Sequence, residues 1–152
     1  MKRKINRKKI YVGFAADILH KGHINILKIA SKLGEVTVGL LTDSAIATYK
    51  KFPILDYKQR EIILKNIKYV NKVIEQDSLD YRKNLMYLKP DYVVHGNDWK
   101  YGIQKKTRQQ VIDTLKKWSG KLIEVPYTKN ISSSQIKDKI LKVANSPESR
   151  LS

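Results

Sequence analysis

The sequence predicts an α/β fold in which helices cover both faces of a single doubly wound, five-stranded parallel sheet. Two observations predict this class. Five short apolar runs, typical of strands buried on both faces, alternate with segments of helical period. The 152 residues also suffice for one domain with a proper core and are too few for two. We expect a basic flexible arm over residues 1–9, the domain over 10–144 and a flexible tail over 145–152.

The first strand and the first helix are predicted at residues 10–14 and 20–33. The strand is a short apolar run, and the helix has apolar residues at helical spacing and ends at Gly34. Small residues at 15–17 form the turn between them. A strand, a tight turn and a helix N-terminus together point backbone N–H groups and the positive end of a helix dipole at an anion.

The remaining elements follow in order along the chain. Strands are predicted from β-branched or aromatic apolar runs at 35–41, 69–74, 91–95 and 121–125. Helices are predicted from apolar stripes just after Thr42-Asp43 and at 56–68, 80–88, 104–118 and 132–143. The core-facing residues expected on the second and the last of these helices are Ile62, Ile63, Ile67, Ile136, Ile140 and Val143. Strand, helix and strand within short spans imply right-handed parallel crossovers.

Composition narrows the function classes. The net charge of +17 suits small polyanionic substrates as well as nucleic acid, but the lysines are spread over nearly every segment and no nucleic-acid-binding motif accompanies them. We therefore expect no nucleic acid as the primary partner. The absence of cysteine excludes disulfides and fits a reducing cytoplasm. Since no apolar run reaches the length of a signal peptide or a membrane span, we expect a cytoplasmic protein without a membrane partner.

Two histidines, His20 and His23, share the first turn of the first predicted helix. Residues three apart lie on one helix face, so both imidazoles can reach the same ligand. Gly22 lies between them and allows a ligand to approach the backbone closely. A metal pair is an alternative, but with one other histidine and no cysteine a zinc site would need carboxylates. From the spacing alone, an ordinary polar first turn fits as well.

Other candidate residues follow later strands, at the sheet edge where open α/β folds bind ligands. Lys50 and Lys51 lie in a loop, where either phosphate binding or solvent exposure explains them. Asp98 and Trp99 end a glycine turn after the strand at 91–95; a carboxylate can accept from the exocyclic amine of a nucleobase, and an indole offers apolar surface. His95 is interpreted as an ordinary strand-end residue.

The last two predicted helices begin with features that suit anions. Lys105, Lys106 and Arg108 crowd a helix start where the dipole disfavours positive side chains, so the cluster is either solvated or binds an anionic head group. Ser132 and Gln135 fit the capping-box pattern, which explains them structurally. Hydroxyls and N–H groups at a serine-rich helix N-terminus also suit phosphate.

Three of these motifs carry a family resemblance. GFAADILHKGH at residues 13–23, GNDW at 96–99 and YTKNISSS at 127–134 resemble the motifs of the HxGH nucleotidyltransferases, in particular the cytidylyltransferase branch typified by glycerol-3-phosphate cytidylyltransferase. The resemblance runs from Ile10 to about Val143. It implies a Rossmann-like domain with strand order 3-2-1-4-5, CTP with Mg²⁺, and a homodimer whose interface includes the helix at 56–68 and the strand after it.

The resemblance also implies the roles of individual residues. The expected catalytic residues, which contact phosphates or neutralise them, are His20, His23, Lys50 and Lys51, with the two lysines not separable. The expected nucleotide-binding residues are Phe14, Ala15, Ala16, Asp17, Gly22, Arg60, Gly96, Asp98, Trp99, Thr128, Ile131, Ser132, Ser133 and Ser134. Acceptor binding is assigned to Lys105, Lys106, Arg108, Tyr127 and Lys129. No metal site made by protein side chains is expected.

Some positions depart from the family pattern or allow a second explanation. Asn97 replaces the first acid of GDDW, Tyr127 replaces an arginine, and Lys129 with Asn130 replaces Glu-Gly. We hypothesise that Lys129 supplies the charge lost with that arginine. Arg60 matches the family, in which the arginine lies near the phosphates, but an exposed helix arginine fits equally well.

The reaction implied by the resemblance joins CTP to a small phosphate- or phosphonate-bearing acceptor and releases pyrophosphate, by in-line attack of an acceptor oxygen on the α-phosphorus. The motifs look most like those of the cytidylyltransferases associated with phosphoenolpyruvate mutase and phosphonate biosynthesis. The expected acceptor is therefore 2-aminoethylphosphonate, followed by hydroxyethylphosphonate. The alternatives are glycerol 3-phosphate, phosphoethanolamine or phosphocholine, an adenylyltransferase and, in another class, a basic nucleic-acid-binding module without catalysis.

Overall fold

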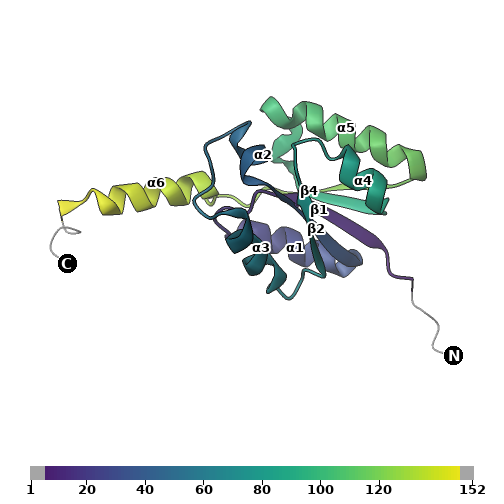
Figure 1. Ribbon diagram of the computed structural model, residues 1–152, viewed down its shortest axis with the longest axis horizontal. Coiled ribbons are helices and arrows are strands. Elements are labelled where there is room, and N and C mark those ends of the chain that lie inside the picture. The colour runs from purple at the N-terminus through teal and green to yellow at the C-terminus, as the bar shows by residue number, and fades with distance from the viewer. Residues whose placement is uncertain (1–5, 148–152) are drawn as a thin grey trace.

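Five parallel strands form one sheet in the computed structural model, which describes residues 6–147 (Figure 1). The sheet order is β3-β2-β1-β4-β5, which confirms the predicted fold class and strand order. The strands are β1 (Lys9–Phe14), β2 (Glu35–Leu41), β3 (Lys72–Gln76), β4 (Tyr92–Gly96) and β5 (Lys121–Val125). Residues 1–5 of the expected arm and 148–152 of the expected tail lie outside the described residues.

Helices α1 and α3 cover one face of the sheet, and α4 and α5 cover the other (Figure 1). The helices are α1 (Lys21–Leu33), α2 (Asp43–Ala47), α3 (Tyr57–Lys65), α4 (Arg82–Leu88), α5 (Lys105–Leu115) and α6 (Ser133–Ala144). Short 3₁₀ segments are η1 (Asn97–Lys100), η2 (Gly102–Gln104) and η3 (Lys116–Trp118). None of the helices in this described part has both the length and the apolar character needed to cross a membrane.

The core lies on both faces of the sheet, and β1 shows why. Ile10 and Val12 pack against Leu27 of α1, whereas Tyr11 between them packs against Leu85 of α4. Successive side chains of a strand point to opposite faces, so a central strand with helices on both sides is apolar throughout. This burial explains why the strands appear as unbroken apolar runs in the sequence.

The third strand begins at Lys72, three residues later than predicted. The residues before it form turns, in which Val70 N donates to Ile67 O at 2.9 Å. Asn71 then joins the edge of β2: its Oδ1 accepts from Val36 N at 2.8 Å, and its own N–H donates to Val36 O at 3.0 Å. The hydrogen bonds of the turn and of the Asn71 side chain therefore make β3 begin later in the chain than the apolar residues alone predict.

The predicted core face of α3 is wrong at two positions. Ile62 and Ile63 are 61% and 42% exposed, whereas Arg60 and Leu64 are fully buried. The guanidinium of Arg60 donates to backbone carbonyls beneath the helix, so the face that carries it turns inward. A buried arginine thus sets the orientation of α3, and the two isoleucines point outward.

The predicted core face of the last helix is also wrong beyond its first turn. Ile140 and Val143 are 54% and 59% exposed, and α6 contains no buried residue. The helix projects away from the sheet and its covering helices (Figure 1). Its N-terminal half is tied to the rest of the domain through Ser133, which hydrogen bonds to Ile18, and through Lys137, which pairs with Asp17.

Candidate active site

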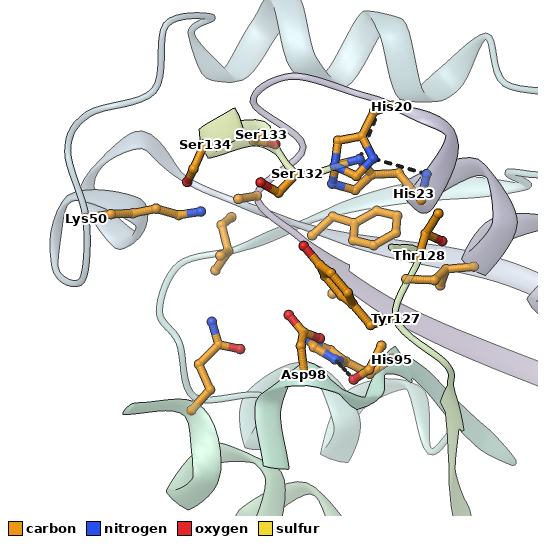
Figure 2. A pocket seen from close by; sticks show the side chains of 18 of the residues that line it. His20, His23, Lys50, His95, Asp98, Tyr127, Thr128, Ser132, Ser133 and Ser134 are labelled. Carbon is orange, nitrogen blue, oxygen red and sulfur yellow. Dashed lines mark hydrogen bonds between the residues drawn. The ribbon is translucent and has the colours of Figure 1, made fainter. Parts of the chain in front are cut away.

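A cavity of about 330 Å³ lies at the carboxyl edge of the sheet (Figure 2). Residues at or just past the ends of all five strands line it, as expected for an open α/β sheet. The N-termini of α1 and α6 also meet there, so the two histidines of the first helix and the three serines of the last line one cavity. This is the arrangement that a single extended anionic ligand requires.

The two histidines are fixed through their Nδ1 atoms. Nδ1 of His20 accepts from Gly22 N at 3.0 Å, and Nδ1 of His23 accepts from His20 N at 3.2 Å. A neutral imidazole that accepts at Nδ1 carries its proton on Nε2. Burial lowers the pKa of His20; burial, then His20 and then Lys50 lower the pKa of His23 to about 4. Both rings are therefore neutral at pH 7 and offer an Nε2–H donor.

The surroundings of the histidines leave their rings little freedom. A Cβ at Gly22 would lie 2.8 Å from Cε1 of His20, so any larger residue at this position would displace the imidazole of His20. On the other side, the ring of Phe14 meets that of His23 edge-on, with centroids 5.1 Å apart. Phe14, Ala15 and Gly22 all line the cavity, where the sequence analysis expects them.

The N-terminus of α6 brings three serines to the same end of the cavity. Oγ of Ser132 caps the helix by accepting from Gln135 N at 3.1 Å, and Oγ of Ser133 donates to Ile18 O at 3.1 Å. Asn130 adopts a left-handed conformation, with φ 64°, in the turn that leads into the cap. Ser132, Ser133 and Ser134 line the cavity, as do Thr128 and Ile131. The cap therefore uses the N–H of Gln135, whereas the N–H groups of Ser133 and Ser134 before it have no intrahelical carbonyl partner.

The two lysines of the loop lie in different places. Lys50 lines the cavity, and its N–H donates to Ile46 O at 3.1 Å at the end of α2. Burial lowers the pKa of Lys50, Lys137 lowers it further, and Asp17 opposes them. Lys51 is exposed and does not line the cavity. The geometry therefore separates the two lysines that the sequence left equivalent.

At the opposite end of the cavity lie His95, Gly96 and Asp98 (Figure 2). Trp99, which is predicted from the sequence to lie against the base, does not line the cavity. Its indole is buried behind His95, stacked on the imidazole with centroids 3.6 Å apart and planes 3° apart. Asn97, a departure from the family pattern, accepts from Tyr127 N at 3.0 Å and so joins the turn to the last loop.

Arg60 lies behind the cavity and is not part of its lining. It is fully buried and donates to Ala15 O at 2.7 Å, Leu41 O at 2.8 Å and Leu55 O at 3.0 Å, and it pairs with Asp43 at 2.6 Å. Neither a phosphate contact nor an exposed helix arginine describes it. Its donors hold the ends of two strands and the lysine loop together.

Asp17 and Ala16 are also placed outside the lining. Asp17 accepts from Ile54 N at 2.8 Å and Leu55 N at 3.1 Å, and it pairs with Lys137 of α6 at 2.5 Å. Burial by itself would raise the pKa of Asp17, but Lys137 and the two N–H donors lower it overall. Ala16 is buried with φ 53°. Both shape the turn that carries the site.

Of the residues assigned to acceptor binding, Tyr127 lines the cavity and Lys129 does not. Lys105, Lys106 and Arg108 line a separate shallow depression beside it. The guanidinium of Arg108 is paired with Glu124 at 2.6 Å. Gln76 ends β3, so its strand-end position could have indicated it as a site residue. The lining residues that were not predicted as site residues include Gly13, Tyr49, Gln76, Leu79, Tyr81, His95, Gln104 and Thr107.

Within residues 6–147 no three histidine, cysteine or acidic side chains form a group that could hold a metal ion. The alternative of a histidine metal pair therefore has no further ligands in this part of the chain. Asp98 is the carboxylate of the cavity, and Lys50 is its aliphatic cation. At the end of the cavity that His20, His23 and the three serines form, most of the polar groups in the lining can donate hydrogen bonds.

Comparison with known proteins agrees with this geometry. The chain is 38% identical over 82 residues to the FAD synthase of Archaeoglobus fulgidus, covering 54% of this chain and 60% of that protein. It is 30% identical over 135 residues to the glycerol-3-phosphate cytidylyltransferase of Bacillus subtilis, covering 88% of this chain and 97% of that protein. A crystal structure of a lipopolysaccharide core biosynthesis protein from Thermoplasma volcanium is similar with a TM-score of 0.66 and 28% identity, covering 82% of this chain and 99% of that one.

The match to the family itself spans most of the domain. Residues 11–139, from the first strand to the middle of α6, match the cytidylyltransferase-like family. This chain therefore belongs to the cytidylyltransferase-like family and is a nucleotidyltransferase.

Proposed function

We propose that the protein transfers CMP from CTP to a small phosphonate and releases pyrophosphate, with 2-aminoethylphosphonate as the first choice of acceptor and hydroxyethylphosphonate as the second. One observation carries the nucleotide part: a single cavity joins the donors of His20, His23 and the serines to the carboxylate of Asp98. A triphosphate fits the first end and a base with an exocyclic amine fits the second. The phosphonate is favoured by the likeness of the sequence motifs.

In the proposed reaction, a phosphonate oxygen attacks the α-phosphorus of CTP and forms a new P–O bond. The bond from the α-phosphorus to the bridging oxygen breaks, and pyrophosphate leaves with that electron pair. The Nε2–H groups of His20 and His23 donate to phosphate oxygens as charge develops, and Lys50 supplies a cationic group. No side chain forms a covalent intermediate. Catalysis is then positioning together with charge stabilisation by preorganised donors.

Mg²⁺ is proposed to enter with CTP as part of the substrate. Mg²⁺ is usually bound through substrate phosphates and water with one or two carboxylates, so it does not require a dedicated cluster of protein ligands. We propose the cytoplasm as the compartment, because a chain without cysteine suits reducing conditions.

Two other combinations of nucleotide and acceptor substrate are supported by the relatives of this chain. Cytidylyl transfer to glycerol 3-phosphate is supported by the relative from Bacillus subtilis. Adenylyl transfer to flavin mononucleotide is supported by the FAD synthase from Archaeoglobus fulgidus. Both would use the same phosphate end of the cavity and differ at the base or acceptor end.

The test is pyrophosphate release with CTP or ATP against a panel of acceptors: the two phosphonates, glycerol 3-phosphate, phosphoethanolamine, phosphocholine and flavin mononucleotide. We expect release with CTP and 2-aminoethylphosphonate, and a loss of about 100-fold or more in a His20→Ala, His23→Ala double variant. Turnover of CTP with phospho-alcohols alone would reject the phosphonate. Turnover of ATP alone would reject cytidylyl transfer.

We also propose that the protein forms a homodimer through α3. Ile62 and Ile63 are exposed side by side on this helix, although the residues of a monomer's helix that contact solvent are usually polar. The family resemblance points to the same helix. A second copy of the chain would cover both side chains.

A further inference from the structure

His95 is held rigidly at the end of β4. Its ring stacks on the buried indole of Trp99, with the planes 3° apart. The indole Nε1 donates to Glu124 at 3.3 Å, and Glu124 in turn accepts from Arg108 at 2.6 Å. This network joins β4, η1, β5 and α5, so the plane of the imidazole is set by groups on four elements.

The hydrogen bonds of His95 leave an acceptor free. Its Nδ1 lies 2.7 Å from Gly96 O, and a carbonyl can only accept, so Nδ1 carries the proton and Nε2 carries a lone pair. Burial lowers the pKa of His95, against the opposing effects of Gly96 O, Asp98 and Glu124, which agrees with a neutral ring. Within residues 6–147 no donor contacts Nε2.

This free acceptor is at least partly accessible. Every fully buried side-chain nitrogen or oxygen of the described residues has a partner, and Nε2 has none, so Nε2 is not fully buried. The ring of His95 lines the cavity, and Asp98 lies beside it at the end away from His20 and His23 (Figure 2). An ionised carboxylate only accepts hydrogen bonds. The base end therefore presents two acceptors from neighbouring residues.

We propose that His95 is a specificity-determining residue, which accepts one N–H of the 4-amino group of cytosine at Nε2 while Asp98 accepts the other. The proposal rests on CTP being the nucleotide, as above. Uracil carries an oxygen, O4, in place of the 4-amino group. This oxygen is itself an acceptor, so O4, Nε2 of His95 and the carboxylate of Asp98 would all lack a donor. A site built to pair with a donor discriminates strongly against an analogue that lacks it.

The test is calorimetric binding of three nucleotides to the full chain: CTP, UTP and the triphosphate of pyrimidin-2-one riboside, which has no substituent at the 4-position. The variant His95→Phe keeps a flat ring over Trp99 and removes the acceptor. We expect CTP to bind about three- to tenfold more weakly to it, with the pyrimidin-2-one nucleotide nearly unchanged. The unchanged nucleotide shows that the phosphate end is intact.

A second variant, His95→Gln, keeps the test possible if His95→Phe does not fold. His95→Gln has an amide that can donate to O4 of uracil as well as accept from cytosine, so we expect its preference for CTP over UTP to fall. If the variants bind all three nucleotides equally more weakly, or keep the wild-type preference for CTP, the proposed role of His95 is overturned. The proposed use of CTP is not affected by that result. A wild-type protein that binds ATP or UTP as tightly as CTP would instead overturn the proposed use of CTP and this inference with it.

Discussion

The backbone N–H of His20 donates to Nδ1 of His23 at 3.2 Å, and the centroids of the two rings lie 4.1 Å apart. Each ring therefore accepts a hydrogen bond from the local backbone at Nδ1, and its Nε2–H is a candidate donor to phosphate. Two imidazoles this close resist protonation, because a charge on one disfavours a charge on the other. The pair acts at neutral pH as two uncharged donors whose orientation is set before any nucleotide binds.

The first prediction concerns stability and pH. The pKa of His23 is about 4 in the folded protein and about 6.5 in the unfolded chain, so the unfolded state binds more protons between these values. Stability must therefore rise with pH across this window and level off above it, by at most about 3 kcal/mol from this residue. Urea unfolding of the nucleotide-free protein from pH 4.5 to pH 7.5 measures the slope.

The variant His23→Gln is the control for this slope. Its amide does not titrate, so the rise in stability with pH should be smaller than in the wild type, leaving the part that comes from other groups whose pKa is lowered, such as His20 and His95. If the two proteins show the same dependence on pH, His23 does not titrate as the structure requires.

The second prediction uses neighbouring lysines as a matched pair. Lys50 lines the cavity and Lys51 does not. We expect Lys50→Met to lower kcat/KM for pyrophosphate release about tenfold or more, because a cationic group near the phosphates is lost. Lys51→Met should stay within about twofold, as expected for an exposed charge. The assay is run at constant ionic strength, since both variants change the net charge equally; equal losses would point to a general field effect and contradict a local role.

The third prediction concerns Arg60. Removing this fully buried guanidinium leaves three carbonyls and Asp43 without their donor, so we expect Arg60→Met to lower the free energy of unfolding by about 3–5 kcal/mol. The exposed pair of Arg82 and Asp80 gives the comparison, and Arg82→Met should lower the free energy of unfolding far less than Arg60→Met does. Urea unfolding measures both. An Arg60→Met variant with wild-type stability and weakened nucleotide binding would restore the phosphate role.

The sequence predicts the sheet and much of the cavity well, because both depend on local patterns. Each strand is buried on both faces, so Tyr11 and its neighbours form an unbroken apolar run. The motifs at His20–His23, Gly96–Asp98 and Ser132–Ser134 directly follow strands or begin helices, and the parallel topology brings all of them to one edge. Position after a strand or at the start of a helix is thus the signal that indicates these residues.

The failures have physical causes that a pattern does not contain. Arg60 counts as a surface residue on any hydropathy scale, yet carbonyls at two strand ends and in the lysine loop bury it and turn Ile62 outward. Trp99 is predicted to lie at the base end, but the three-dimensional stack places the ring of His95, and not the indole, in the lining of the cavity. The apolar spacing of α6 predicts a core face, but the helix extends beyond the body that could cover it.

The last prediction tests what covers α3. If a second copy packs on this helix, then Ile62→Glu places a charge in an apolar interface. The dissociation constant of the dimer should then rise at least about tenfold. Sedimentation equilibrium over a range of protein concentrations measures the dissociation constant, and the monomer should keep its fold because Ile62 is 61% exposed within one chain.

The matched control is Ile140→Glu on α6, where the isoleucine is similarly exposed, at 54%. It introduces the same charge on a helix that the proposed interface does not include, so the dissociation constant should change by less than about twofold. Dissociation caused by Ile140→Glu and not by Ile62→Glu would move the interface to the projecting helix. Because the N-terminus of α6 carries Ser132–Ser134 into the cavity, such an interface would then tie assembly directly to nucleotide binding.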